Sequence, residues 1–286
     1  MSALAVVRPG PLTTVQDLGR RGVAHLGVPR AGALDEPALR AANRLTGNDP
    51  GAAVLETTVG GVALRTLGPV LLAVTGAPAP VRVDGRPAAW GAAVAVPANA
   101  LVEVGPATHG VRSYLAVAGG IAVPPVLGSR SADLLSGLGP PPLAVGTVLP
   151  VGPPPALRPR PELVPLPAPP AGLVLRLHLG PRADWFEPGA VARLARDRYR
   201  VAAASNRIAL RTDGPPVGRA RSGELPSEGM VLGAVQVPPD GRPVVFLADH
   251  PTTGGYPVVG VVPPADLAAA AQARPGTPLR FVLLRG

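Results

Sequence analysis

Hydrophobic residues occur along this chain in short runs that glycine, proline and other turn residues separate. Runs of this length, rich in valine and leucine, are typical of β-strands. The pattern predicts strands at residues 3–7, 54–59, 62–65, 70–75, 81–83, 93–96, 101–104, 114–117, 173–179, 209–212, 231–237, 244–248, 258–262 and 279–284. Asp84 and Gly85 follow one run and predict a hairpin turn.

Three segments have helical spacing instead. Residues 36–45 follow Asp35, which can cap the first turn, and precede Gly47, which can end the helix. Residues 188–198 and 266–273 predict two further short helices. Many short strands with few helices favour a mainly β protein made of barrels over a βαβ sheet.

A proline-rich stretch at residues 150–170 interrupts this pattern. Such segments are extended and semi-rigid, and they have little to bury. We therefore expect an N-terminal β-rich subdomain at residues 1–150, a linker at 151–170 and a C-terminal β-rich subdomain at 171–286.

Composition narrows the possible chemistry. Glycine and proline number 36 and 40 of 286 residues, but hydrophobic residues make up 47%, so the chain is expected to fold. There is no cysteine, which excludes disulfides, thiolate zinc sites and cysteine nucleophiles. There is also no lysine, which excludes a P-loop, a Schiff base and covalently attached biotin on this chain.

The formal net charge is +9, but the arginines are scattered and aromatic residues make up only 3%. Nucleic-acid binding favours clustered arginines with stacking aromatics, so we expect none. The first residues do not form a secretion signal, and prolines interrupt the longest uncharged run, residues 134–157. We expect a soluble, cytoplasmic protein without a membrane partner.

Two polar segments lie in the N-terminal half. Residues 9–20, which include Gln16 and Asp17, are expected to form a loop; the simpler interpretation is a turn in which Asp17 binds backbone amides. Residues 27–35 lead into the predicted helix, whose first amides could bind an anion. The simpler role for Asp35 is that of a helix cap.

The N-terminal half contains two further candidate polar residues, Asn43 and Glu56. Glu56 lies in a β-type run beside two threonines, where a carboxylate is unusual.

The C-terminal half has one short and one long polar segment. Asn206 and Arg207 could bind a carboxylate through the guanidinium, or could form a local turn. In residues 223–257, apolar runs alternate with polar side chains: Glu224, Gln236, Asp249, His250, Thr252, Thr253 and Tyr256.

Asp249 and His250 follow the apolar run 244–248 and are expected at a strand end, before a flexible polar loop at 252–256. Neighbours on an extended chain point to opposite sides, so they are not expected to act as a catalytic pair. We favour Asp249 as the functional one. The four histidines are far apart in sequence and predict no metal site. A G-x-S-x-G nucleophile elbow is also missing.

These segments together resemble the biotin-dependent carboxyltransferase, or allophanate hydrolase subunit 2, family. The family includes the C subunit of 5-oxoprolinase, the KipA-like regulator and the carboxyltransferase domain of urea carboxylase. The matching blocks are PGPLTTVQDLGRRG, HLGVPRAGALDEPALRAANRLTGN, LETTVGG, YLAVAGGI, VLGSRSADL, SNR, ELPSEGM, GAVQVPPDG and ADHPTTGGYP. They cover nearly the whole chain in one order, which is more specific than any single motif.

The resemblance implies two cyclophilin-like β-barrel subdomains with a cleft between them. It implies Asp249 and Glu224 as catalytic residues. It implies a substrate-binding set of Gln16, Asp17, Asp35, Asn43, Glu56, Asn206, Arg207, Gln236, Thr252, Thr253, Gly254, Gly255 and Tyr256. Many relatives carry a different pair where this chain has His250 and Pro251, so the resemblance assigns no role to His250.

As a stand-alone protein, the chain most resembles the C subunit of an ATP-dependent 5-oxoprolinase. Such a complex opens 5-oxo-L-proline to L-glutamate together with subunits A and B, the latter KipI-like. Two alternatives stay open: a carboxyltransferase that uses biotin carried on another chain, and a non-catalytic KipA-like regulator that binds a partner similar to the B subunit.

Overall fold

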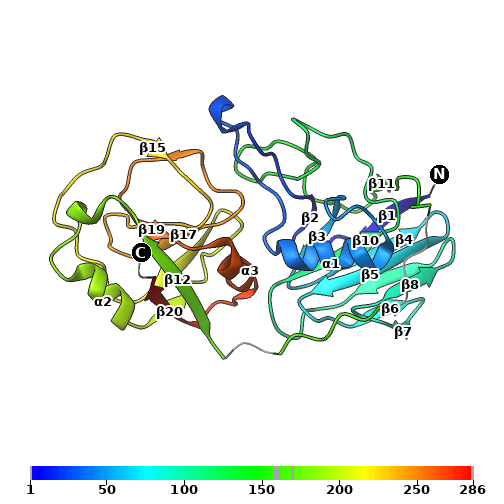
Figure 1. Ribbon diagram of the computed structural model, residues 1–286. Helices are drawn as coiled ribbons and strands as arrows, with labels where there is room; N and C mark the ends of the chain where they lie inside the picture. Colours follow the sequence, from blue (N-terminus) through cyan, green and yellow to red (C-terminus); the bar gives the residue numbers. More distant parts are fainter. Residues whose placement is uncertain (1, 157–161, 169–170, 285–286) are drawn as a thin grey trace. The chain divides into compact units, whose positions relative to one another are not determined.

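A computed structural model describes residues 2–156, 162–168 and 171–284. The chain divides into two compact units (Figure 1). The first comprises Met1–Arg20, Ala31–Asp133 and Gly137–Pro169, and the second comprises Arg21–Arg30, Leu134–Ser136 and Pro170–Gly286. The second unit thus includes two segments from within residues 1–150, which the sequence had assigned to the N-terminal subdomain.

The first unit contains two antiparallel sheets. The six-stranded sheet runs β11 (Val148–Pro150), β1 (Ala3–Arg8), β4 (Val62–Thr66), β9 (Leu101–Val104), β6 (Val81–Val83) and β7 (Arg86–Ala88). The five-stranded sheet runs β2 (Thr13–Gln16), β3 (Val54–Thr58), β10 (Arg112–Val117), β5 (Val70–Gly76) and β8 (Ala93–Val96). Their facing sides share one hydrophobic core, to which Leu4 and Leu64 contribute from one sheet and Leu55 and Leu72 from the other.

Helix α1 (Glu36–Thr46) covers the other face of the five-stranded sheet (Figure 1). Its residues Leu39 and Ala42 pack against Val54, Tyr114 and Ala116 of that sheet. The helix begins as the sequence predicts, with the Asp35 side chain accepting a hydrogen bond from the Ala38 amide, and it ends at Gly47. Strands β3 and β10 are therefore buried on both sides.

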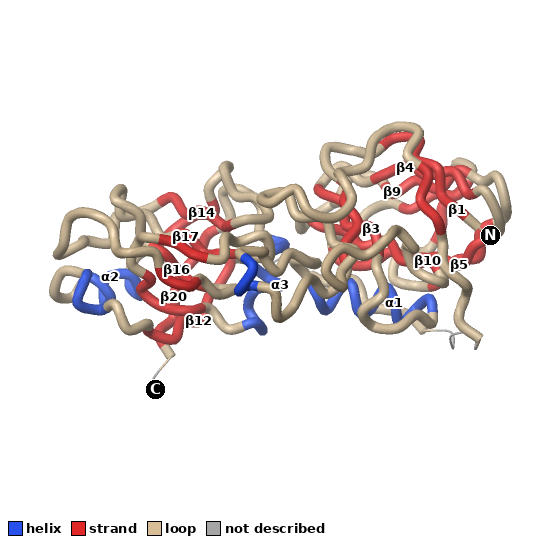
Figure 2. The backbone as a smooth tube through the Cα atoms, turned by 90° about the horizontal axis from the view of Figure 1, so that it is seen from above, coloured by secondary structure: helices blue, strands red, loops and turns tan. Residues whose placement is uncertain are grey.

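The second unit is a closed barrel in the order β12 (Leu173–Leu179), β19 (Val258–Val261), β16 (Ala234–Gln236), β17 (Val244–Phe246), β14 (Ala209–Asp213), β13 (Tyr199–Val201) and β20 (Pro278–Leu283). β12 and β20 pair in parallel, and the other described pairs of the barrel are antiparallel. Helices α2 (Ala190–Arg196) and α3 (Pro264–Gln272) lie beside the barrel strands (Figure 2). A small separate sheet pairs β15 (Glu228–Gly229) with β18 (Thr253–Gly254), and the short 3-10 helices η1 (Ala24–Leu26) and η2 (Ala183–Trp185) complete the unit.

The mainly β class and the three short helices are confirmed, but one expected loop is wrong. Residues 13–16 form strand β2, which pairs with β3 over its whole length. The segment lacks an apolar–polar alternation because all four side chains are buried, three of them polar. Hydrogen bonds hold these polar side chains in place: Thr13 donates to the Pro9 carbonyl, and the Gln16 side-chain nitrogen donates to Thr14 and to the Ala132 carbonyl.

Part of the expected linker also contacts the first unit. Leu163 forms a β-bridge with Ala92, and the Val164 amide donates to the Gly91 carbonyl over 2.7 Å. Glu162 forms an exposed ion pair with Arg44 of α1, at 2.8 Å. Residues 157–161 and 169–170 of this prediction lie outside the described residues. Within the described part of the chain, no helix is long and apolar enough to cross a membrane.

Candidate functional site

Strands β2, β3 and β10 place a row of polar side chains on the sheet face that α1 covers. Thr14, Glu56 and Tyr114 are direct neighbours in the strand register. The Tyr114 hydroxyl donates to the Glu56 carboxylate over 2.8 Å, and the Leu34 amide donates to the same oxygen. Arg112 lies 3.5 Å from the other oxygen. Glu56 is thus a buried carboxylate with charged and neutral partners, consistent with its unusual place in a strand.

Tyr114 also fixes the segment before α1, because its oxygen accepts a hydrogen bond from the Asp35 amide at 2.8 Å. Burial, together with the nearby Glu56 and Asp35 carboxylates, raises the pKa of Tyr114 well above its usual value. The phenol therefore stays protonated and remains a donor to Glu56.

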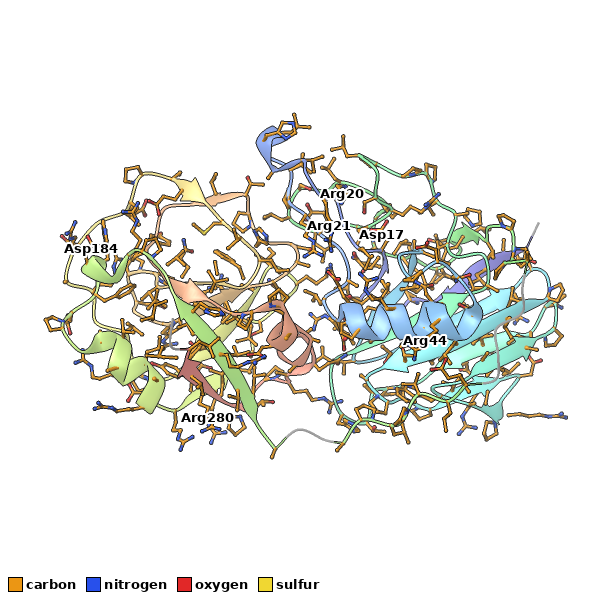
Figure 3. All side chains as sticks on the ribbon, in the orientation of Figure 1. Asp17, Arg20, Arg21, Arg44, Asp184 and Arg280 are labelled. Carbon is orange, nitrogen blue, oxygen red and sulfur yellow. The ribbon has the colours of Figure 1, made fainter. Side chains whose placement is uncertain are left out.

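Asp17 organises a second loop in the same unit. Its carboxylate accepts hydrogen bonds from the Ser129 and Ser131 hydroxyls and from the Arg130 amide, each at 2.6 Å, and from the Gly19 amide at 2.8 Å. In Figure 3, Asp17 and Arg20 lie close together. The structure thus gives Asp17 the amide-binding role that the simpler interpretation expected, with partners distant in sequence.

Asp35 and Asn43 also make structural contacts. Asp35 caps α1, while Asn43 donates to the Ala52 carbonyl at 2.8 Å and accepts from Asn48. Asp17 and Glu56 therefore both bind the segment that enters α1 and contains Asp35, since the Ala33 amide donates to the Asp17 carbonyl and the Leu34 amide to Glu56. Gln16 binds Thr14 and Ala132 instead. Asn43, near the opposite end of the helix, is not part of this group.

In the second unit, Arg207 and Asp249 form a buried ion pair. Both carboxylate oxygens accept a guanidinium hydrogen bond at 2.9 Å, and the exposed fractions of the two side chains are 1% and 0%. The two N–H groups of the guanidinium match the two oxygens of a carboxylate in this geometry. Because the pair is buried, removal of either partner would leave an unpaired buried charge and would destabilise the fold. Arg207 thus holds a carboxylate of its own chain.

Two loops that carry most of the remaining candidates pair with each other. Glu228 and Gly229 of β15 pair with Gly254 and Thr253 of β18. The Leu225 amide donates to the Gly255 carbonyl, and the Met230 amide donates to the Thr252 carbonyl. We call residues 224–230 and 252–256 together the paired loops. The segment 252–256 is thus held by a short sheet, whereas the sequence predicted a flexible loop.

The side chains of the paired loops include one exposed polar contact. Hydrogen bonding to the neighbouring Glu224 carboxylate raises the pKa of Tyr256 above its ordinary value. Gln236 of β16 donates to the Tyr256 carbonyl at 3.2 Å. Glu224, Gln236 and Tyr256 are therefore brought together. The pairing of the loops also brings residues 252–255 next to residues 225–230.

The remaining predicted residues of this unit have local roles. Asn206 accepts from the Ile208 and Ala209 amides, which forms the turn that was the alternative interpretation of this segment. His250 is buried, and its ring faces the Pro251 carbonyl at 2.7 Å. Among the residues that the structure describes, no three His, Cys, Asp or Glu side chains gather to hold a metal ion.

Several residues of these networks were not singled out in the sequence. Tyr114, Ser129 and Ser131 bind the predicted carboxylates, and two arginines of the second unit lie over the Trp185 ring. The two serines lie in the block VLGSRSADL, so that resemblance was the signal for them. Tyr114 begins the block YLAVAGGI, so the same signal was present for it. Trp185 lies in no matching block and gave no such signal, because a lone aromatic residue more often indicates a core position.

Comparisons with known proteins agree with this arrangement. A family model described as "Carboxyltransferase domain, subdomain A and B" matches residues 26–283. The chain is 38% identical to the C subunit of the 5-oxoprolinase of Escherichia coli (strain K12), over 98% of this chain and 90% of that protein. It is 33% identical to the Haemophilus influenzae protein of the same name, over 94% of this chain and 87% of that one.

Solved structures share the fold over 99% of this chain. The structure of TTHA0988 has a TM-score of 0.90 and 39% identity, and this chain covers 56% of it. The Kluyveromyces lactis urea amidolyase has a TM-score of 0.91 and 30% identity, and this chain covers 19% of it. The chain therefore spans about half of the first protein and about a fifth of the second.

Proposed function

Because the chain belongs to the family of carboxyltransferase domains with subdomains A and B, we propose that it acts as the C subunit of an ATP-dependent 5-oxoprolinase. The complex would contain subunits A and B and would open 5-oxo-L-proline to L-glutamate in the cytoplasm. One observation carries the proposal: the match to a protein of that name extends over 98% of this chain and 90% of the relative.

The reaction has three requirements. A lactam carbonyl is a poor electrophile, so it must be activated, and ATP would supply this in the complex. A water must then be oriented towards the carbonyl carbon, and the ring nitrogen must receive a proton. We assign ATP to the complex as a whole and place no phosphate contact on residues of this chain.

Within this chain, we assign direct contact with the substrate to Glu224 and Tyr256. Glu224 is exposed and can accept a proton from water, and the protonated Tyr256 hydroxyl can donate a hydrogen bond. Asp249 receives a different role from the one the sequence favoured, because both its oxygens are bound by Arg207 and it is not exposed. In this proposal, the ion pair anchors the chain from which residues 252–256 extend.

The test is a reconstituted complex of this chain with subunits A and B. We expect glutamate formation and ATP hydrolysis that both depend on 5-oxo-L-proline. Glu224→Gln should lower kcat by about 10²-fold, the usual size of an acid–base contribution, and Glu103→Gln, which neutralises a carboxylate of the first unit, should leave it unchanged. A complex that assembles and forms no glutamate contradicts the proposal.

A carboxyltransferase is the second candidate, favoured by the family description and by the fold shared with a urea amidolyase. The chain has no lysine, so biotin would have to be attached to another protein. This candidate predicts decarboxylation of carboxybiotin when a small amide or urea-type acceptor is added. A stable complex with a partner similar to the B subunit, and no turnover in either assay, would support the KipA-like regulator instead.

A further inference from the structure

Two arginine side chains from one loop lie over the Trp185 ring. The guanidinium carbons of Arg219 and Arg221 lie 5.8 and 5.7 Å from the centre of the Trp185 ring. Tryptophan is the best aromatic partner for a cation, and both distances are within the range of this interaction. Trp185 is buried, with 9% of the residue exposed.

The same short segment of chain binds this loop at further points. Arg182 forms an ion pair with Glu228, and Asp184 forms one with Arg221 at 2.9 Å. The Ala220 amide donates to the Trp185 carbonyl at 2.9 Å, and Phe186 forms a β-bridge with Arg219. Figure 3 labels Asp184, which lies on the 3-10 helix η2 together with Trp185.

The loop, residues 218–229, has no apolar anchor of its own. Val217 before it and Met230 after it are buried, but none of its residues, all described by the structure, is buried. Loops with so few buried apolar contacts open most easily, so the charged and aromatic contacts of residues 219–221 act together with the β15–β18 pairing at residues 228–229 to hold this one. Further along the same loop, Glu224 neighbours Tyr256 and the Leu225 amide donates to the Gly255 carbonyl at 2.7 Å.

We propose that Trp185 is a positioning residue for the candidate site: by holding Arg219 and Arg221, it fixes the 218–229 loop so that Glu224 reaches Tyr256. The inference rests on the proposed function for its catalytic consequence, because Glu224 and Tyr256 are the groups assigned to the substrate. The positioning itself is a property of this chain and can be measured without turnover. Trp185 touches no substrate in this proposal.

The measurement that isolates the positioning is a tyrosine titration, followed by tyrosinate absorbance. The chain has three tyrosines, and burial separates Tyr114 and Tyr199 from Tyr256 by raising their pKa values, that of Tyr199 to about 12. The bond from Glu224 is the largest influence on Tyr256, and the smaller influence of Arg219 acts in the opposite direction. Losing the bond should therefore lower the first transition towards about 10.

We expect Trp185→Leu to lower the pH midpoint of the first tyrosine transition, as Glu224→Gln should do directly. Trp185→Phe should keep this midpoint near the wild-type value, because phenylalanine keeps a ring face for the arginines. In the reconstituted complex, Trp185→Leu should raise KM about two- to tenfold, the scale of weakened cation–π contacts, with a smaller change in kcat. Trp90→Leu makes the same replacement in the first unit and should leave the titration unchanged.

The outcomes separate the two proposals. An unchanged first transition in Trp185→Leu, while Glu224→Gln shifts it, overturns the positioning role whatever the activity. A shifted transition together with a complex that never forms glutamate supports the positioning and contradicts the 5-oxoprolinase assignment. A shift in Trp90→Leu equal to that in Trp185→Leu would attribute the effect to general loosening and also overturn the inference.

Discussion

At the scale of single residues, Val59 holds an unfavourable backbone conformation. Its φ is +54°, in the left-handed region that β-branched side chains rarely adopt. Its amide donates to Val111 and its carbonyl accepts from Ala107, each at 2.7 Å, so the surrounding loops hold it there. The side chain itself is 43% exposed and contributes little packing in return.

Replacing Val59 with asparagine should therefore raise the free energy of unfolding by about 1 kcal/mol, because asparagine tolerates this conformation. Urea denaturation measures the change. Val7→Asn is the matched control, since Val7 is also 43% exposed but lies in strand β1 and does not have a positive φ. An equal gain in both variants would show that backbone strain is not the cause.

Tyr199 is a second residue whose chemistry conflicts with its surroundings. Its ring packs edge-on against Phe281 with 5.6 Å between the ring centres, but its hydroxyl is buried without a hydrogen-bond partner among the described residues. Burial, with the negative charge of Asp197, raises the pKa of Tyr199 to about 12.

Tyr199→Phe should thus be neutral or stabilising by about 1 kcal/mol near neutral pH, because it removes an unsatisfied polar atom and keeps the ring contact. In the wild type, the contribution of the protonated Tyr199 to the free energy of unfolding is fully present below about pH 10, the ordinary tyrosine pKa. It is lost as the pH rises from there through 12, because the tyrosine of the unfolded chain loses its proton first. The stability advantage of the variant should grow over that interval in urea titrations, and an advantage that shrinks there contradicts this account.

At the scale of secondary-structure elements, α1 depends on the cap that the sequence predicted. The Asp35 carboxylate accepts from the Ala38 amide at 3.0 Å, while the Asp35 amide is bound by Tyr114. A capping role needs only a side-chain acceptor, which asparagine also provides.

Asp35→Ala should lower the free energy of unfolding by about 1 kcal/mol, whereas Asp35→Asn should cost only a few tenths. Chemical denaturation of both variants tests the capping role. The activity of the reconstituted complex tests whether the Asp35 carboxylate also has a role in the function. If Asp35→Asn is stable yet inactive, the carboxylate has a role beyond capping the helix.

The contrast between α1 and β2 shows which elements could be predicted from the sequence. Helix α1 has a cap, an apolar face and a terminating glycine, all of them local signals. β2 is buried on both sides and carries polar residues, so its signal lies in partners such as Ala132 that are distant in the sequence. The same holds for the candidate site. Its polar residues could be identified from the sequence, but contacts such as those of Glu56 with Tyr114 and of Arg207 with Asp249 join residues distant in the sequence and could not.

At the scale of the whole molecule, composition and strand spacing were enough for the mainly β class, but not for the division into units. Residues 21–30 and 134–136 belong to the second unit although they lie within the sequence of the first. Nothing local marks such an exchange, because it depends on which surface each segment finally packs against. Residues 162–168 are a similar case: a proline-rich composition predicted a spacer, yet they bind the first unit.

The parallel pairing of β12 with β20 has a consequence for how the protein is made. Both sheets of the first unit are complete once β11, ending at Pro150, has been synthesised. The barrel of the second unit closes only through β20, which pairs with both β12 and β13 and follows every other barrel strand in the sequence. Translation proceeds from the N-terminus at about 5–20 residues per second, so the barrel must wait for the ribosome to release this strand. Residues 21–30 are synthesised much earlier and cannot pack against their own unit until it has folded. During this interval the unpaired strands of the second unit are exposed, and we expect a nascent-chain chaperone to bind them then.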